Sequence, residues 1–318
     1  MSGSLTSEKA PLPRPEGRRR LFSRSRVRRR GVRQVPWLLV VPAVVAVLLL
    51  RYGATVLGGL YAFTDWNGLG LYPNWIGFDN FRAMFKDEAT SGALWHTLQL
   101  ATMFVVLVNL TGLALALGLR STLKTRNLLR AIFFLPVVLS ELATAYIWQY
   151  IFLYDGPLNL FLGFVGLDEW KRAWTADPTW ALYTILFVLI WQLSGLTMII
   201  YLAGLQSIPE ELEQAAAVDG ASAWMRFRRI TLPLLAPAIT VSVTLTMIFG
   251  LRVFDQVIAL TGGGPVSSTE TLATQVYKQT FVFTRFGYGA AVALFLTVLV
   301  AAITLVQAAA LRSREYRV

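Results

Sequence analysis

Long runs of apolar residues alternate with shorter polar segments along the chain after residue 35. Six of these runs reach at least the roughly 20 residues that a helix needs to cross a bilayer. They cover residues 36–63, 94–119, 128–153, 180–205, 234–260 and 289–311. The pattern predicts an all-α, polytopic membrane protein with six transmembrane helices.

The composition agrees with this prediction. Of the 318 residues, 55% are hydrophobic and only 15% are charged, whereas soluble domains carry about 25% charged residues. We expect three parts: a basic arm over 1–34, a transmembrane domain over 35–312 and a tail over 313–318. A polar loop at 206–233 interrupts the transmembrane domain.

The net charge of +11 comes largely from the N-terminal arm, which holds eleven of the 29 Lys and Arg residues. The arm has few apolar residues before Val35 and cannot bury a core, so we expect it to be disordered. A basic segment beside a hydrophobic span is a topology signal that also contacts anionic lipid. We therefore expect membrane lipid, and no nucleic acid, as its partner. The apolar run behind the arm is too long for a cleavable signal peptide.

Lys and Arg residues are unevenly divided between the two sides of the predicted membrane domain. With the N-terminus inside, 21 of the 29 fall in cytoplasmic segments, six fall in outer loops, and Arg51 and Arg252 fall within spans. Cytoplasmic loops normally carry the excess of Lys and Arg. Both termini and the 206–233 loop are therefore expected to be cytoplasmic. At Arg51 we expect the first helix to be broken or displaced, or the side chain to extend to the interface.

Several kinds of chemistry find no support in the sequence. The chain has no Cys and a single His, His96, so it offers neither a disulfide nor a multi-histidine metal site. It contains no G-x-x-x-x-G-K-[ST] phosphate cradle. No pairing of nucleophile and base stands out, so we expect no enzymatic activity, no metal and no cofactor of its own. If ATP drives the protein, a partner subunit binds it.

The 206–233 loop has the features of two short helices joined by a tight corner. Pro209 suits a first helical position, and three Glu residues follow in the first turn, where negative charge is favourable. The run 215–217 is all Ala, so the predicted helix forms readily and presents a face of small side chains. Gly220 permits a sharp reversal, and Asp219 is expected to cap the helix that follows. Such a loop suits contact with a soluble partner.

A different interpretation of this loop is an amphipathic helix that lies on lipid with its basic face. Glu210, Glu211 and Glu213 oppose that interpretation, since anionic lipid would repel them.

The loop resembles the EAA loop of binding-protein-dependent ABC importers, by which the permease docks on the ATP-hydrolysing subunit. The motif, commonly E-A-A-x-x-x-G followed by I-x-L-P, falls on Gln214, Ala215, Ala216, Gly220, Ile230, Leu232 and Pro233. The family usually has Glu where this chain has Gln214, and Glu213 lies about 100° away around a helix. The resemblance implies that contact with the ATPase involves Gln214, Ala215, Ala216, Asp219, Gly220, Ala221 and Phe227.

Further segments are similar to the carbohydrate branch of that family, of the maltose and glycerol-phosphate type. They are 75–81, 133–136, 155–159, 260–265, 268–272 and 286–291. The resemblance implies the first of two permease subunits in a bacterial plasma-membrane importer for a sugar, polyol or oligosaccharide. It also implies a second permease subunit, two ATP-binding subunits and an extracytoplasmic solute-binding protein.

Polar residues inside membrane spans are costly and are usually paired or functional. A sugar offers hydroxyls for hydrogen bonds and C–H faces for aromatic side chains, so such residues suit a sugar path. The candidates are Glu141, Trp148, Gln192, Ser194, Thr246, Gly250, Arg252 and Asp255. Arg252 and Asp255 are i,i+3 neighbours and can form an ion pair. That pair either lines the path or only neutralises itself.

An alternative function remains open on the sequence. Glu141 or Asp255 would serve as the ion carrier of a proton- or ion-coupled secondary transporter. That interpretation leaves the Ala-rich loop without a role. Uptake that persists without an ATPase but collapses with an uncoupler would favour it.

The predicted topology is testable because the chain has no Cys of its own. A cysteine placed at Ala223 is expected to resist an impermeant thiol reagent in intact cells and to react after the cells are opened. A cysteine in the outer loop at Asn67 is the control and is expected to react in both. Labelling at position 223 from outside would contradict the topology.

Overall fold

The computed structural model describes residues 37–70, 72–120 and 124–315, and these are almost entirely helical. Within them the only β pairing is an isolated bridge between Thr64 and Trp75. The prediction of an all-α protein is confirmed. The basic arm over 1–34 lies outside the described residues, so its disorder stays a prediction.

The chain divides into two compact units between Tyr52 and Gly53. In the first unit the described part is α1 (Trp37–Val47) and most of a π-helical turn, Leu48–Gly53. Arg51 lies in this turn, so the helix is locally widened at the position where the sequence predicts a disturbance.

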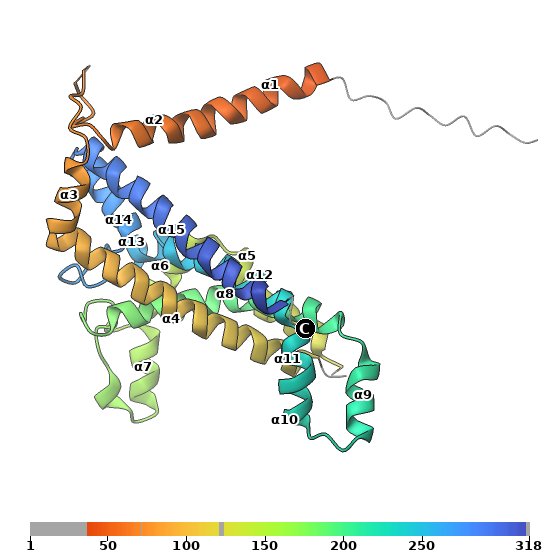
Figure 1. The fold of residues 1–318 in the computed structure, drawn as a ribbon. Helices are drawn as coiled ribbons and strands as arrows, with labels where there is room; N and C mark the ends of the chain where they lie inside the picture. The colour runs from red at the N-terminus through yellow and green to blue at the C-terminus, as the bar shows by residue number, and fades with distance from the viewer. Residues whose placement is uncertain (1–36, 71, 121–123, 316–318) are drawn as a thin grey trace, which may run out of the picture. The chain divides into compact units, whose positions relative to one another are not determined.

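The second unit contains the remaining helices, drawn in Figure 1. Its long helices are α4 (Glu88–Leu119), α8 (Ala181–Gln206), α12 (Ala236–Leu251) and α15 (Phe286–Glu315). The shorter ones are α2 (Ala54–Tyr61), α3 (Asp79–Lys86), α5 (Arg126–Val138), α6 (Glu141–Ile151), α7 (Pro157–Phe164), α9 (Glu210–Val218), α10 (Ala223–Arg226), α11 (Leu232–Leu234), α13 (Asp255–Thr261) and α14 (Leu272–Tyr277).

Four of the six predicted spans are single helices long and apolar enough to cross a membrane. They are Val40–Tyr61, Glu88–Leu119, Ala181–Gln206 and Phe286–Arg312. The third and fifth predicted spans are not continuous helices. The third divides into α5 and α6, which meet at 99°. In the fifth, α12 joins the preceding 223–234 helical segment at 68° and ends at Leu251, before α13 begins at Asp255. Hydropathy does not detect the breaks at 139–140 and 252–254, because both halves are apolar and neither break contains Gly or Pro. The 68° bend at Leu235, in contrast, lies between Pro233 and Pro237.

Helices α4, α8 and α12 pack together as the centre of the second unit. At their contact a buried amide, that of Asn109 on α4, is hydrogen-bonded on both ends. Its Nδ2 donates to Thr246 Oγ1 on α12 at 2.9 Å, and its Oδ1 accepts from Tyr201 on α8 at 2.7 Å and from Ser242 on α12 at 2.6 Å. One side chain therefore holds three helices in a fixed register. An unpartnered amide in an apolar interior would cost about 1–3 kcal/mol.

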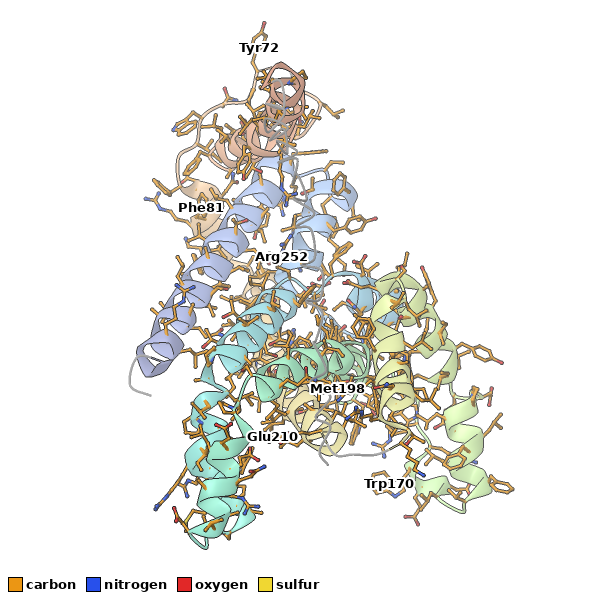
Figure 2. All side chains as sticks on the ribbon, turned by 90° about the vertical axis from the view of Figure 1, so that its right-hand side faces the viewer. Tyr72, Phe81, Trp170, Met198, Glu210 and Arg252 are labelled. Carbon is orange, nitrogen blue, oxygen red and sulfur yellow. The ribbon has the colours of Figure 1, made fainter. Side chains whose placement is uncertain are left out.

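Close backbone packing reinforces the contact between α4 and α8. Gly112 on α4 lies against Thr197 on α8, so a Cβ added at Gly112 would fall 2.0 Å from Thr197 Oγ1 and 2.9 Å from the Met198 backbone nitrogen. Any larger residue at this position would separate the two helices. Figure 2 labels Met198 in the middle of α8.

The breaks between α5 and α6 and between α12 and α13 are each stabilised by a side chain that donates a hydrogen bond to a backbone carbonyl beside the break. Gln192 Nε2 donates to the Leu139 carbonyl at 3.3 Å at the α5–α6 break. Thr271 Oγ1 donates to the Val253 carbonyl at 3.0 Å at the α12–α13 break. Irregular backbone is tolerated at membrane depth where protein buries it or where it lines a polar cavity.

Candidate functional site

Helices α9 and α10 form a hairpin that connects the end of α8 to the segment entering α12 (Figure 1). Its corner is a paired hydrogen-bond motif at the end of α9. The Ala221 amide donates to the Ala216 carbonyl at 2.9 Å, and the Gly220 amide donates to the Ala217 carbonyl at 3.1 Å. Gly220 adopts φ +80°, in the left-handed region that side chains resist. The predicted sharp corner at Gly220 is confirmed.

Two details of the hairpin differ from the sequence prediction. Ser222, not Asp219, caps α10, because its side chain accepts from the Met225 amide at 3.3 Å. Asp219 instead ends α9, because the chain needs Gly220 and Ala221 to complete the corner before a new helix begins. Pro209 precedes the first helical residue instead of occupying it.

The hairpin is tied to the rest of the second unit through Glu213. Its Oε1 accepts from Arg120 Nη1, just beyond α4, at 2.7 Å and from Thr231 Oγ1 at 3.0 Å. Burial alone would raise the pKa of the Glu213 carboxyl, but the bonds from Arg120 and Thr231 and the charges of Arg120 and Arg226 outweigh it, so this pKa lies below its usual 4.5. The Glu213 carboxylate is thus bonded to residues of its own chain, whereas the side chain of the neighbouring Gln214 is exposed.

The outer surface of the hairpin combines small residues with exposed apolar ones. Ala216, Asp219, Gly220 and Ala221 line a hollow of about 420 Å³, together with Met225, Arg226, Arg229 and Ile230. Gln214 and Ala215 are exposed beside it. Val218 is 88% exposed and Trp224 is 67% exposed. Phe227 stacks on Trp224 at 5.6 Å between ring centroids. Six of the seven residues predicted for docking therefore lie in this hairpin, and Phe227 follows directly after α10.

A second candidate site is a cavity of about 390 Å³ beside both helix breaks. Glu141, the first residue of α6, contributes a carboxylate, and Arg252 and Gln256 contribute donors from the end of α12 and from α13. Phe104 and Phe249 add aromatic faces, and the other lining residues are aliphatic. Figure 2 labels Arg252 at the end of α12. The cavity therefore pairs hydrogen-bonding groups with apolar and aromatic surface.

The eight residues predicted for the solute path do not all meet at this cavity. Glu141 and Arg252 line it, and Asp255 lies near Glu141. Gln192 is not part of the lining, but its side-chain Oε1 accepts a hydrogen bond from Gln256 Nε2, a lining residue, at 3.2 Å.

The remaining path candidates have other surroundings. Trp148 lies in a separate aromatic pocket of about 400 Å³ with Trp174 and Trp180. Ser194 is buried and bonds within α8, where its hydroxyl donates to the Trp191 carbonyl. Thr246 bonds to Asn109, and Gly250 packs against Ala101 of α4. Thr246 and Gly250 therefore hold helices together, and Ser194, Thr246 and Gly250 all lie outside the lining of the cavity.

The predicted ion pair between Arg252 and Asp255 does not form in the described part of the chain. The prediction assumed a continuous helix, but α12 ends before Arg252 and α13 starts at Asp255. The break turns Asp255 toward Glu141, and Arg252 is left facing the cavity.

Some residues of both sites are not among the predicted site residues. Gln256 stands out in the sequence as a polar residue of the fifth predicted span, but it is not among the eight path candidates. The sequence does not indicate that Phe104 and Phe249 line a cavity, because an aromatic residue in a membrane span can equally well face lipid. Arg120 is 93 residues from Glu213, so only the fold brings the two together.

Known proteins are similar to this one over most of the chain. A family described as "Binding-protein-dependent transport system inner membrane component" matches residues 108–315. The multiple sugar-binding transport system permease protein MsmF of Streptococcus mutans is 35% identical over 85% of this chain and 92% of its own length.

Two solved structures of bacterial alginate transporters contain a similar chain. One, of a transporter involved in the import of the acidic polysaccharide alginate, has a TM-score of 0.76 at 26% identity and covers 87% of this chain and 94% of that chain. The other, in complex with an alginate pentasaccharide-bound periplasmic protein, has a TM-score of 0.73 at 26% identity and covers 85% and 91%.

The bond between Arg120 and Glu213 is testable with a double-mutant cycle. Arg120→Gln and Glu213→Gln, made singly and together, are expected to show a coupling energy of about 1 kcal/mol in thermal unfolding, the scale for a partly exposed ion pair. Glu211→Gln, on the same helix with no ion pair in the described residues, is the control and should leave stability unchanged. Additive effects of the two substitutions would contradict the contact.

The same contact has a defined pH dependence. Because folding lowers the pKa of Glu213, its contribution is complete above the unfolded pKa near 4.5 and is lost as pH falls through the folded value. Unfolding temperatures measured below pH 4.5 are therefore expected to fall more steeply for the wild type than for Glu213→Gln. Parallel curves would refute the assignment.

Proposed function

The chain belongs to the family of binding-protein-dependent transport system inner membrane components, and on that premise we propose that it is a permease subunit of an ATP-driven importer for a sugar or oligosaccharide. The observation that carries the proposal is the α9–α10 hairpin, a rigid corner with an exposed small and apolar surface. Such a surface exceeds what a solvated loop needs and suits a protein partner. In this proposal the partner is the ATPase, and the hairpin is cytoplasmic, as the Lys and Arg distribution predicts.

The proposed coupling uses the direct connections of the hairpin. Helix α9 follows α8, and α10 leads through α11 into α12. Glu213 adds a bond to Arg120, just beyond α4. Closure of the ATPase pair around ATP would displace the hairpin, and the displacement would reach α4, α8 and α12 together because Asn109 locks these three helices. All three helices border the cavity, so its opening would alternate between the two sides.

The proposed solute is a sugar or oligosaccharide. Glu141, Arg252 and Gln256 offer hydrogen bonds to hydroxyls, and Phe104 and Phe249 offer faces for C–H surfaces. The names of the sugar-binding and alginate relatives agree with this chemistry. Arg252 adds a positive charge, which would favour a solute that carries a carboxylate. An ion-coupled mechanism through Glu141 or Asp255 lacks this support, since the family is defined by transport with a binding protein.

The proposed assembly contains a second permease subunit, two ATP-binding subunits and an extracytoplasmic solute-binding protein in a bacterial plasma membrane. The chain has no phosphate cradle of its own, so ATP is assigned to the partner subunits. The structural relative solved with a periplasmic protein supports the binding-protein partner. In this proposal the permease performs no chemistry on the solute.

The coupling role of the corner is tested by Gly220→Leu. A leucine at φ +80° is strained by about 1–3 kcal/mol and would obstruct the hollow beside it, so the variant is expected to insert normally, lose ATP-dependent uptake and retain less ATPase on purification. Gly220→Asn, which tolerates the left-handed region, should keep most activity. Gly92→Leu, where an added Cβ meets nothing within 4 Å, controls for the substitution. Full uptake by Gly220→Leu at normal expression would reject the coupling role.

The solute path is tested at the cavity by Arg252→Gln. Loss of one charge-assisted hydrogen bond is expected to lower kcat/KM for uptake by about tenfold, with unchanged assembly and unchanged ATPase retention. Lys86→Gln, an exposed substitution on α3 far from the cavity lining, is the control. Unchanged uptake kinetics in Arg252→Gln would remove this residue from the path.

A further inference from the structure

Three arginines converge on a hollow beside the start of α5, and two of them, Arg126 and Arg130, have no part in the proposed coupling or transport. Arg120 lies just beyond α4, and Arg126 and Arg130 lie in the first two turns of α5. With Gln206 and Glu210 they border a hollow of about 270 Å³, whose remaining wall is formed by Leu202, Leu205 and Ile208. Glu210 is the only acidic residue of this lining, so the three arginines leave the lining with a net positive charge. Most of the accessible lining is polar.

The start of α5 carries charge of the unexpected sign. Helix N-termini favour anions, because their first amides and the helix dipole present positive charge. Here the first turn contains no acidic residue, and the preceding Thr125 provides no side-chain cap. Arg126 and Arg130 instead add two positive charges, i and i+4, at this end. An anion in the hollow would offset both the dipole and the arginines.

The arginines are also incompletely paired in the described part of the chain. Arg130 Nη2 donates to the Leu119 carbonyl at 3.0 Å, but its buried Nε has no hydrogen-bond partner. Neither Arg126 nor Arg130 forms an ion pair there. Arg120 uses one nitrogen on Glu213, and a guanidinium has further donors to offer. Arg126 is exposed and Arg130 is partly exposed, so both keep guanidinium donors that a ligand in the hollow can reach.

We propose that this hollow binds a phosphate group, held by Arg126 and Arg130 at the N-terminus of α5 with Arg120 beside it. Planar guanidinium groups bind phosphate oxygens in pairs, and helix N-termini bind phosphate through their amides. The phosphate comes either from an anionic phospholipid or from soluble phosphate. Basic pockets between membrane helices on the cytoplasmic side suit lipid headgroups. A lipid as the source of the phosphate depends on the proposed function, in which this side of the protein is cytoplasmic. The binding of a phosphate group by the arginines does not depend on it.

The site is tested on the assembled transporter with Arg126→Gln and Arg130→Gln combined. Arg120 is left intact so that its bond to Glu213 survives. Lys124→Gln combined with Arg228→Gln removes the same charge from exposed positions that line no part of the hollow. Native mass spectrometry after exchange into phosphatidylglycerol or phosphatidylcholine counts the retained lipids. Titration with inorganic phosphate, using chloride as the reference anion, is followed by thermal unfolding.

The wild type and the control are expected to retain phosphatidylglycerol at least tenfold better than phosphatidylcholine, and the arginine variant is expected to lose that preference. Stabilisation by inorganic phosphate, lost in the same variant, would support the site with soluble phosphate as its source. Equal retention and equal phosphate response in the variant and the control would overturn the proposal. Loss of the ATPase subunit from the variant, with lipid and phosphate binding unchanged, would overturn it in favour of a protein contact. Because both readouts work without uptake, failure of the importer proposal would be visible separately.

Discussion

The second unit depends on one constraint, that polar groups placed among apolar helices must find partners within the protein. Asn109 meets this constraint most completely. It lies where α4, α8 and α12 touch, and its amide bonds to Tyr201, Ser242 and Thr246. Each of these bonds has a directional requirement that apolar packing lacks. The three helices therefore have one register.

The same constraint explains why the helix breaks are tolerated. Interrupting a helix at membrane depth releases backbone groups, and here Gln192 and Thr271 bond carbonyls beside the two interruptions. The interruptions in turn direct polar residues into a shared space. Glu141 begins α6 and Asp255 begins α13, positions where a carboxylate is favoured by the helix dipole. The cavity beside them thus follows from broken helices, and continuous ones would have turned Arg252 and Asp255 toward each other.

The hairpin illustrates how neighbouring polar residues take different roles. Glu213 faces inward, is bonded to Arg120 and Thr231, and fixes the hairpin to the second unit. Gln214, one residue later, is exposed on the outer side. Gln214, the position where the resemblance implies Glu, is therefore exposed, and Glu213 does not replace it. An amide there still accepts and donates hydrogen bonds, but it forms no ion pair.

The sequence by itself determined the features that depend on composition and short spacing. Apolar runs of sufficient length predicted the all-α membrane class and four of the helices, because burial in lipid requires both properties at once. The Ala run and Gly220 predicted the corner, because a sharp turn after a helix needs a residue in the left-handed region, and glycine adopts it most readily. What only the tertiary structure decided are the contacts between distant segments: Asn109 with Tyr201, Arg120 with Glu213, and the convergence of Arg120, Arg126 and Arg130 on one hollow. The two helix breaks belong to the same group, because the side chains that bond carbonyls beside them come from other parts of the chain, and no local pattern records that help.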